Sequence, residues 1–311
     1  MGRGGDQILR RGSRRGGGGS LAQENGTGWL FASPYLAYAL VFFLGPLVWA
    51  FWLMLTDWNL MSESWKWVGF ANFLDAFQSD HVRAAFVNSF KYLLAIVPLT
   101  LSIALGIALL LHSLPPSLKG LFSVAYFIPY LSSGVATSVF VKFFFSYSSS
   151  FNIWLRNSLN VKISWFTDPR TAFWVIVGII VWKVSGYYAL FLFAAFEAIP
   201  PEIGEAAELD GATGPRRFFS ISLPMILPTV TTVLVLATGL AFGVFSEPFL
   251  LTGGGPRLAT TSWQLELYNA SFVSFRSGYG AAIALLMALN IFIVIRAITA
   301  IMNRATEKGA A

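Results

Sequence analysis

The chain has 311 residues, of which 56% are hydrophobic and 12% are charged, and its formal net charge is +6. Soluble domains carry about 25% charged residues, so this composition, with a mean hydropathy of +0.65, predicts an integral membrane protein. Excess lysine and arginine sets topology in membrane proteins, so the positive charge does not indicate nucleic acid, and the absence of cysteine excludes disulfides and thiolate metal sites.

The first segment, residues 1–28, is rich in glycine and arginine and shows no apolar periodicity. This composition predicts a disordered cytoplasmic tail. The apolar stretch after it is too long for the core of a signal peptide and lacks a clear cleavage site of small residues. Residues 29–311 are therefore predicted to form one transmembrane domain that begins with a retained span.

Six stretches of that domain are apolar enough to cross a bilayer as helices, which takes about 20 residues each. They are residues 30–55, 86–111, 120–145, 171–196, 225–250 and 279–303. Because lipid offers no partner for a free backbone amide, the predicted fold class is an all-α membrane protein with six transmembrane helices. The prolines inside these stretches are each expected to bend or break a helix. They are Pro34, Pro46, Pro98, Pro129 and Pro248.

The basic residues around the first span predict the orientation. Before the span lie Arg3, Arg10, Arg11, Arg14 and Arg15, and the loop after it holds Lys66 and Arg83. Because cytoplasmic flanks carry the excess of lysine and arginine, both termini are predicted to lie in the cytoplasm of a bacterium or archaeon. The chain would be a multi-pass protein of the cytoplasmic membrane.

The fourth and fifth spans are joined by a polar loop, residues 200–224, that has its own helical pattern. Pro200 and Pro201 suit a helix start, because proline lacks only an amide that the first turn leaves free. Residues 202–209 continue as a short helix. Gly211 after it predicts a turn, since glycine adopts a left-handed backbone at little cost.

A second short helix is expected after this turn. Thr213 is placed to cap it, and Pro215 falls in its first turn. We expect this helix to end at Phe219 and the chain to re-enter the membrane at Pro224. The loop is thus predicted to be a helix-turn-helix on the membrane surface.

The same loop resembles the EAA loop of ABC importer permeases, which reads Glu-Ala-Ala, three residues, Gly, nine residues, Ile-x-Leu-Pro. The positions are filled without a gap by Glu205, Ala206, Ala207, Gly211, Ile221, Leu223 and Pro224, and Asp210 stands before the glycine. The resemblance implies that the loop docks into a cleft on a separate ATPase and passes its motion to the spans. A plain amphipathic connector is the alternative.

Two further stretches resemble the permeases of carbohydrate-uptake ABC importers, of the maltose and glycerol-phosphate type. Residues 67–73 resemble the first outer loop of that group. Residues 245–256 resemble the end of its fifth span, which runs into Leu-Thr-x-Gly-Gly-Pro, and the sequence Leu-Thr-Gly-Gly-Gly-Pro found here resembles the first of the two permeases. The family often has Asp where Ser246 stands, and here the acid comes one position later, at Glu247.

A path for the solute is expected near the fourth and fifth spans. Carbohydrate sites are built from aromatic faces and hydrogen-bonding groups, which Trp182, Tyr187 and Tyr188 offer. The resemblance places Tyr187 where the maltose permease has a tyrosine near the sugar, and the stretch from Leu240 to Val244 where it has further contacts. Leu240 and Val244 are both apolar, so weak binding of the solute is expected. Helix packing is the alternative for the tyrosines.

Among the charged residues in the predicted spans, Lys91 and Arg296 lie within reach of an interface, whereas Lys183 falls near mid-depth and Glu247 in the outer part of its span. A charge at the bilayer centre costs roughly 2.5–3.5 kcal/mol on insertion scales, so such residues need a partner or water. We expect Lys183 and Glu247 either to face a water-filled cavity or to pair with each other.

The resemblance implies a transport subunit for a sugar or sugar-like solute, within an assembly. Its partners would be a second homologous permease, an ABC ATPase dimer, an extracytoplasmic solute-binding protein and the lipid bilayer. The sequence has no Gly-x-x-x-x-Gly-Lys-Ser/Thr loop, so ATP and Mg are expected on the partner ATPase, with no cofactor in this chain.

Two other classes of function compete with this one. An ion-gradient-driven secondary carrier would use Glu247 and Lys183 as a charge relay, but it leaves the EAA pattern unexplained. A membrane enzyme would need a catalytic cluster, and the sequence has no cysteine and only two histidines, His81 and His112, both in predicted loops.

Overall fold

The structure is a computed structural model that describes residues 19–309, with side chains described for residues 28–304. Regular structure in this part of the chain is helical, apart from an isolated bridge between Thr56 and Trp67. The chain divides into two compact units, residues 1–52 and residues 53–311. The α-helices are α1 (Gly19–Ala39), α2 (Gly45–Leu53), α3 (Ala71–Gln78), α4 (Asp80–Ser113), α5 (Pro116–Leu131), α6 (Gly134–Phe144), α7 (Ser150–Leu159), α8 (Pro169–Glu197), α9 (Pro201–Leu209), α10 (Gly214–Arg217), α11 (Leu223–Phe242), α12 (Ser246–Leu251), α13 (Trp263–Tyr268) and α14 (Ser277–Gly309). π-Helical turns occupy Leu40–Leu44 (η1), Phe218–Ser222 (η2) and Asn269–Val273 (η3).

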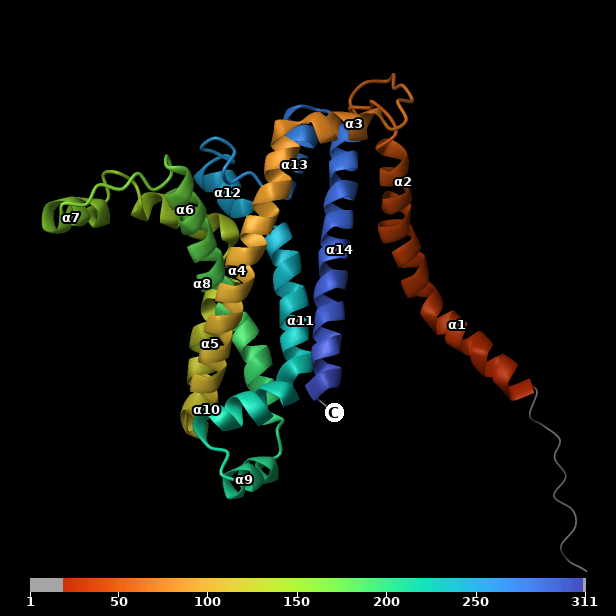
Figure 1. The fold of residues 1–311 in the computed structure, drawn as a ribbon. Helices are drawn as coiled ribbons and strands as arrows, with labels where there is room; N and C mark the ends of the chain where they lie inside the picture. Colours follow the sequence, from red (N-terminus) through yellow and green to blue (C-terminus); the bar gives the residue numbers. More distant parts are fainter. Residues whose placement is uncertain (1–18, 310–311) are drawn as a thin grey trace, which may run out of the picture. The chain divides into compact units, whose positions relative to one another are not determined.

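Five helical segments among the described residues are long and apolar enough to cross a membrane, and a bent helix pair provides a sixth candidate. The five are Gly28–Leu53, Asp80–Ser113, Pro169–Glu197, Gly214–Leu251 and Ser277–Arg304. In the second unit, α4 packs against α8 and α11, and α11 also packs against α8 and α14 (Figure 1). The predicted all-α membrane fold is confirmed.

The first unit contains a local adjustment around a proline. The Gly45 amide donates to the Leu40 carbonyl, five residues back, which closes the wider turn η1 immediately before Pro46. A proline ring crowds the carbonyl four residues before it, and the extra residue of a π-turn relieves that crowding. Of the predicted tail, residues 1–18 lie outside the described residues, and α1 begins at Gly19.

The third predicted span, residues 120–145, is two helices rather than one. α5 and α6 meet at 85° across a break of two residues. Pro129 lies in the last turn of α5, where it supplies no amide. The Ser132 hydroxyl donates to the Pro129 carbonyl over 2.6 Å and lies 3.0 Å from the Thr137 hydroxyl of α6. The prediction of a single helix over residues 120–145 is therefore wrong. Pro98, in contrast, ends no helix and lies within α4.

The fifth predicted span, residues 225–250, is also interrupted. α11 ends at Phe242, where the Gly243 amide donates to the carbonyls of Gly239 and Leu240, both over 3.0 Å. The chain then starts α12, with Pro248 in its first turn, where the missing amide is not needed. Glu247 therefore lies on a short helix of its own at the end of the candidate span Gly214–Leu251, and not on the continuous helix of α11.

Small residues allow the helices of the core to approach closely. Ala104 of α4 and Ala189 of α8 are fully buried. Gly186 of α8 lies against the backbone of α5, where an added Cβ would be 1.9 Å from the Tyr126 carbonyl oxygen. Lipid is as apolar as leucine, so close packing of this kind replaces the hydrophobic effect as the force between spans.

Candidate functional site

A helix-turn-helix made of α9 and α10 lies at one end of the bundle, opposite α13 (Figure 1). α9 follows Pro200, with Pro201 as its first residue, and ends at a glycine elbow with Gly211 at φ +74°. The Gly211 amide donates to the Glu208 carbonyl over 3.1 Å, and the Ala212 amide donates to the Ala207 carbonyl over 2.8 Å. This pair of bonds satisfies carbonyls that the last helical turn leaves free, so the predicted glycine turn is confirmed.

The second limb of the motif differs from the prediction. Thr213 precedes α10, but its side chain makes no capping hydrogen bond. The helix does not end at Phe219, because α10 passes through η2 into α11 and carries Pro224 in the first turn of that span. The wider turn η2 accommodates the proline, which would crowd the carbonyl of residue 220 in a regular helix. Ile221 and Leu223 are half-buried along this continuous limb.

The surface of the helix-turn-helix is partly charged and partly apolar. Glu205, Ala206 and Asp210 are exposed, whereas Ala207 is buried beneath the turn. Leu209 is 90% exposed and Phe219 is 65% exposed. Water is an unfavourable environment for large apolar side chains, so this surface has the character of a contact face.

A salt bridge ties the two limbs together. Arg217 of α10 donates to Glu208 of α9 over 2.8 Å. Its guanidinium lies directly over Gly204, where an added Cβ would be 2.2 Å from Nη2. Sequence reasoning missed this pair, although the absence of a side chain at Gly204 was a visible signal.

Next to this motif, three helix ends meet at one carboxylate. Glu197 is the last residue of α8. Its carboxylate accepts a hydrogen bond from the Lys119 amino group of α5 over 2.7 Å and also lies 2.7 Å from the His112 ring of α4. These side chains line a cavity of about 650 Å³ that Glu205 and Arg217 also border. The residues are far apart in sequence, so no local pattern predicted this cluster, and His112 lies in a helix rather than in the expected loop.

Lys183 and Glu247 lie together in the structure. The Lys183 amino group donates to the Glu247 carboxylate over 2.9 Å, with side chains 16% and 7% exposed. The pair joins α8 to α12 beside the break between α5 and α6, because a Cβ on Gly134 would be 3.3 Å from the Lys183 amino nitrogen. Of the two expected arrangements, pairing is the one observed.

The other predicted path residues do not form a single site. Tyr187 stacks on Tyr130 of α5, with ring centroids 4.1 Å apart and an interplanar angle of 6°, and Tyr188 is buried beside it. Trp182 instead lines an apolar cavity of about 800 Å³ between α6 and α8. On the next span Leu240 is half-buried and Val244 is buried. Sequence reasoning missed Tyr130, which directly follows Pro129 at the break.

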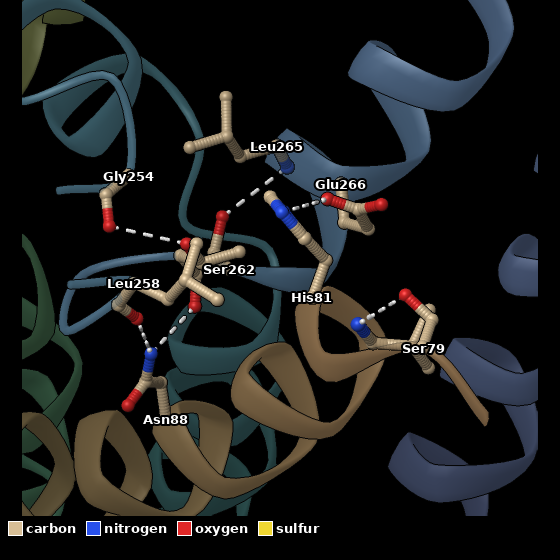
Figure 2. A network of polar contacts seen from close by, with 10 residues as sticks. Ser79, His81, Asn88, Gly254, Leu258, Ser262, Leu265 and Glu266 are labelled. Carbon is tan, nitrogen blue, oxygen red and sulfur yellow. Dashed lines mark hydrogen bonds and ion pairs between the residues drawn. The ribbon is translucent and has the colours of Figure 1, made fainter. Parts of the chain in front are cut away.

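At the opposite end of the bundle, the loop between α12 and α13 is fastened to α4. The Asn88 side chain donates to the carbonyls of Leu258 and Thr261, over 2.7 and 3.0 Å (Figure 2). Nearby, His81 lies 3.3 Å from the Glu266 carboxylate. Burial raises the pKa of Glu266, and the neighbouring His81 partly offsets this rise.

Comparisons with known proteins agree with this architecture. The family of binding-protein-dependent transport system inner membrane components matches residues 96–308. The probable ABC transporter permease protein YesP of Bacillus subtilis is 31% identical over 282 residues, which cover 88% of this chain and 90% of that protein. The sulfoquinovosyl glycerol transport system permease protein SmoG of Agrobacterium fabrum is 32% identical over 223 residues, covering 71% of this chain and 72% of that protein.

A solved structure supports the fold independently. A chain of a bacterial ABC transporter involved in the import of the acidic polysaccharide alginate aligns with a TM-score of 0.78 and 21% identity. The alignment covers 92% of this chain and 99% of that chain. The helical framework with its bent pair, the family match and these relatives agree, and the chain belongs to the family of binding-protein-dependent transport system inner membrane components, as a multi-pass permease subunit of an ABC importer.

Proposed function

We propose that this permease translocates a sugar or sugar-like solute, which an extracytoplasmic binding protein delivers and ATP hydrolysis on a separate ATPase dimer drives. The relatives support the solute class, since SmoG is a sulfoquinovosyl glycerol transport system permease protein. The sequence Leu-Thr-Gly-Gly-Gly-Pro supports a place as the first of two different permeases in a heterodimer.

The observation that carries the proposal is the exposed helix-turn-helix. Glu205, Gly211 and the Ile221-to-Pro224 segment keep the EAA spacing on a folded motif whose elbow is a left-handed glycine. Leu209 stands exposed at the end of α9. A cleft on the ATPase would cover this apolar surface, and Glu205 would meet a basic residue in a charge-assisted contact.

This assignment orients the chain in the membrane. The α9 end would face the cytoplasm, with both termini on the same side, and the α12–α13 loop would face outward. The ATPase would bind ATP and Mg, and this chain would switch between inward-open and outward-open states by rigid-body motion of its spans. The alternative function, an ion-gradient-driven secondary carrier, is not favoured, because Lys183 and Glu247 are paired with each other and the chain belongs to a family of ABC importer components.

Reconstitution tests the proposal. The chain, the second permease and the ATPase are placed in proteoliposomes with the binding protein, and uptake of radiolabelled sugars is followed. We expect uptake that requires ATP, the ATPase and the binding protein together. ATP turnover by this polypeptide alone, or uptake driven by an ion gradient without ATP, would refute it.

A further inference from the structure

The loop between α12 and α13, residues 252–262, has a strained turn at its tip. Arg257 and Leu258 have φ values of 51° and 60°. Left-handed backbone costs roughly 1–2 kcal/mol for each residue with a side chain. Two such residues in succession persist only where the surroundings hold them, and strain of this kind gathers at binding and switching sites.

Buried hydrogen bonds hold this turn in place. Asn88 of α4 is buried, and its amide donates to the carbonyl of Leu258, within the turn, and to that of Thr261, which follows it (Figure 2). Tyr92, one helical turn further along α4, donates to the Thr260 carbonyl over 3.1 Å. The Asn88 oxygen in turn accepts from Lys91 over 3.0 Å, so this amide is satisfied on both sides.

Contacts within the loop complete its rigidity. The Thr260 hydroxyl lies 2.7 Å from the Thr252 hydroxyl and 2.7 Å from the Gly255 carbonyl. The Thr261 hydroxyl donates to the Gly254 carbonyl over 3.1 Å. The loop is therefore set before any partner arrives, and binding to it costs little ordering entropy.

One side chain of this rigid loop remains available. Arg257 is exposed, and no described side chain or carbonyl lies within hydrogen-bonding or ion-pair distance of its guanidinium. Two other cations near this end are engaged: Arg276 pairs with Asp75, and Lys142 donates to the Leu250 carbonyl. The strained turn thus presents a single free guanidinium.

We propose that loop 252–262 is a docking element for the extracytoplasmic binding protein, and that Arg257 pairs with a carboxylate on that protein. The inference rests on the proposed function, which places this loop outside. A guanidinium pairs with a carboxylate through two parallel hydrogen bonds, which fixes orientation as well as attraction. The loop between α12 and α13 lies at the end of the bundle (Figure 1), and Arg257 falls outside the candidate spans, which favours a protein surface over the solute as the source of the carboxylate.

The test titrates the reconstituted complex with the purified binding protein of the same transporter and follows stimulated ATP hydrolysis. Arg257→Ala should raise the half-saturating concentration by about threefold to tenfold, with an unchanged maximal rate, and the difference should shrink at high salt. Arg257→Lys should lose less. Arg83→Ala, an exposed cation on regular helix at the start of α4, serves as the matched control and should behave as wild type.

Arg257→Gly separates docking from folding. Glycine relieves the left-handed strain, so a merely structural turn would be unharmed, whereas docking should weaken as it does for Arg257→Ala. Unchanged half-saturation in both variants would overturn the inference, as would a fall in maximal uptake at saturating binding protein, which would assign Arg257 to the solute. A wild-type complex that its binding protein does not stimulate would instead refute the proposed function, and this inference with it.

Discussion

The two ends of the bundle differ in how far contacts within the chain bury their side chains and pair their polar groups. At the α13 end, buried hydrogen bonds from Asn88 fix a loop that carries a strained turn. At the α9 end, the salt bridge from Arg217 to Glu208 is largely exposed, and Leu209 stands in the open. The difference shows that this chain's own buried bonds hold the first end rigid, whereas the second end leaves a large apolar side chain exposed for a partner to cover.

The largest effect is expected from breaking the buried pair near the α13 end. Lys183→Met leaves Glu247 buried without its partner, which should destabilise the fold by about 3–5 kcal/mol, since an uncompensated buried charge is the costly outcome. Thermal unfolding in detergent measures the loss. Lys183→Met with Glu247→Leu should recover most of it, and a double variant as unstable as the single one would show that the pair is not what holds α8 to α12.

A pair of glycines sharpens the comparison. Gly186→Ala forces a methyl group against the Tyr126 carbonyl, which is backbone, so we expect about 1–3 kcal/mol of destabilisation. Gly204→Ala meets only the guanidinium of Arg217, which is free to swing away, so its effect should stay within about 0.5 kcal/mol. The unfolding midpoints of the two variants, each compared with wild type, measure the two losses of stability. Equal losses would mean that the α9 end is as tightly packed as the core.

The smallest effect concerns pH at the α13 end. Burial holds the pKa of Glu266 above that of an unfolded chain, so the folded state keeps this proton to higher pH. The stabilisation that the protonated Glu266 carboxyl provides is complete below the pKa of the unfolded state, and it is lost as the pH rises through the raised pKa of the folded state. Glu266→Gln should therefore flatten the fall of stability with rising pH, from the acidic range towards neutrality. An identical pH profile for wild type and variant would contradict this.

Sequence reasoning succeeded where the determining interactions are local. The spans follow from apolar length, and the elbow at Gly211 follows from the conformational freedom of glycine. It failed where distant segments decide. The cluster of His112, Lys119 and Glu197 joins three helix ends and leaves no pattern in any one of them.

The broken spans show the same limit. Pro129 indicated a bend, but the position of the bend between α5 and α6 depends on Ser132 and on the packing around Gly134. Pro98 gave the same signal and lies within a helix that continues, because a proline alone does not decide whether neighbouring segments accept a break.

The most direct test of the central claim measures capture of the ATPase by this chain. Glu205→Lys and Gly211→Asp are compared with wild type and with Glu202→Lys, which makes the same charge change on α9 outside the EAA spacing. We predict that Glu205→Lys and Gly211→Asp remain in the membrane but lose the ATPase on co-purification, or hydrolyse ATP without uptake, while Glu202→Lys behaves as wild type. Normal capture with wild-type uptake in both variants would show that the helix-turn-helix is not the coupling element.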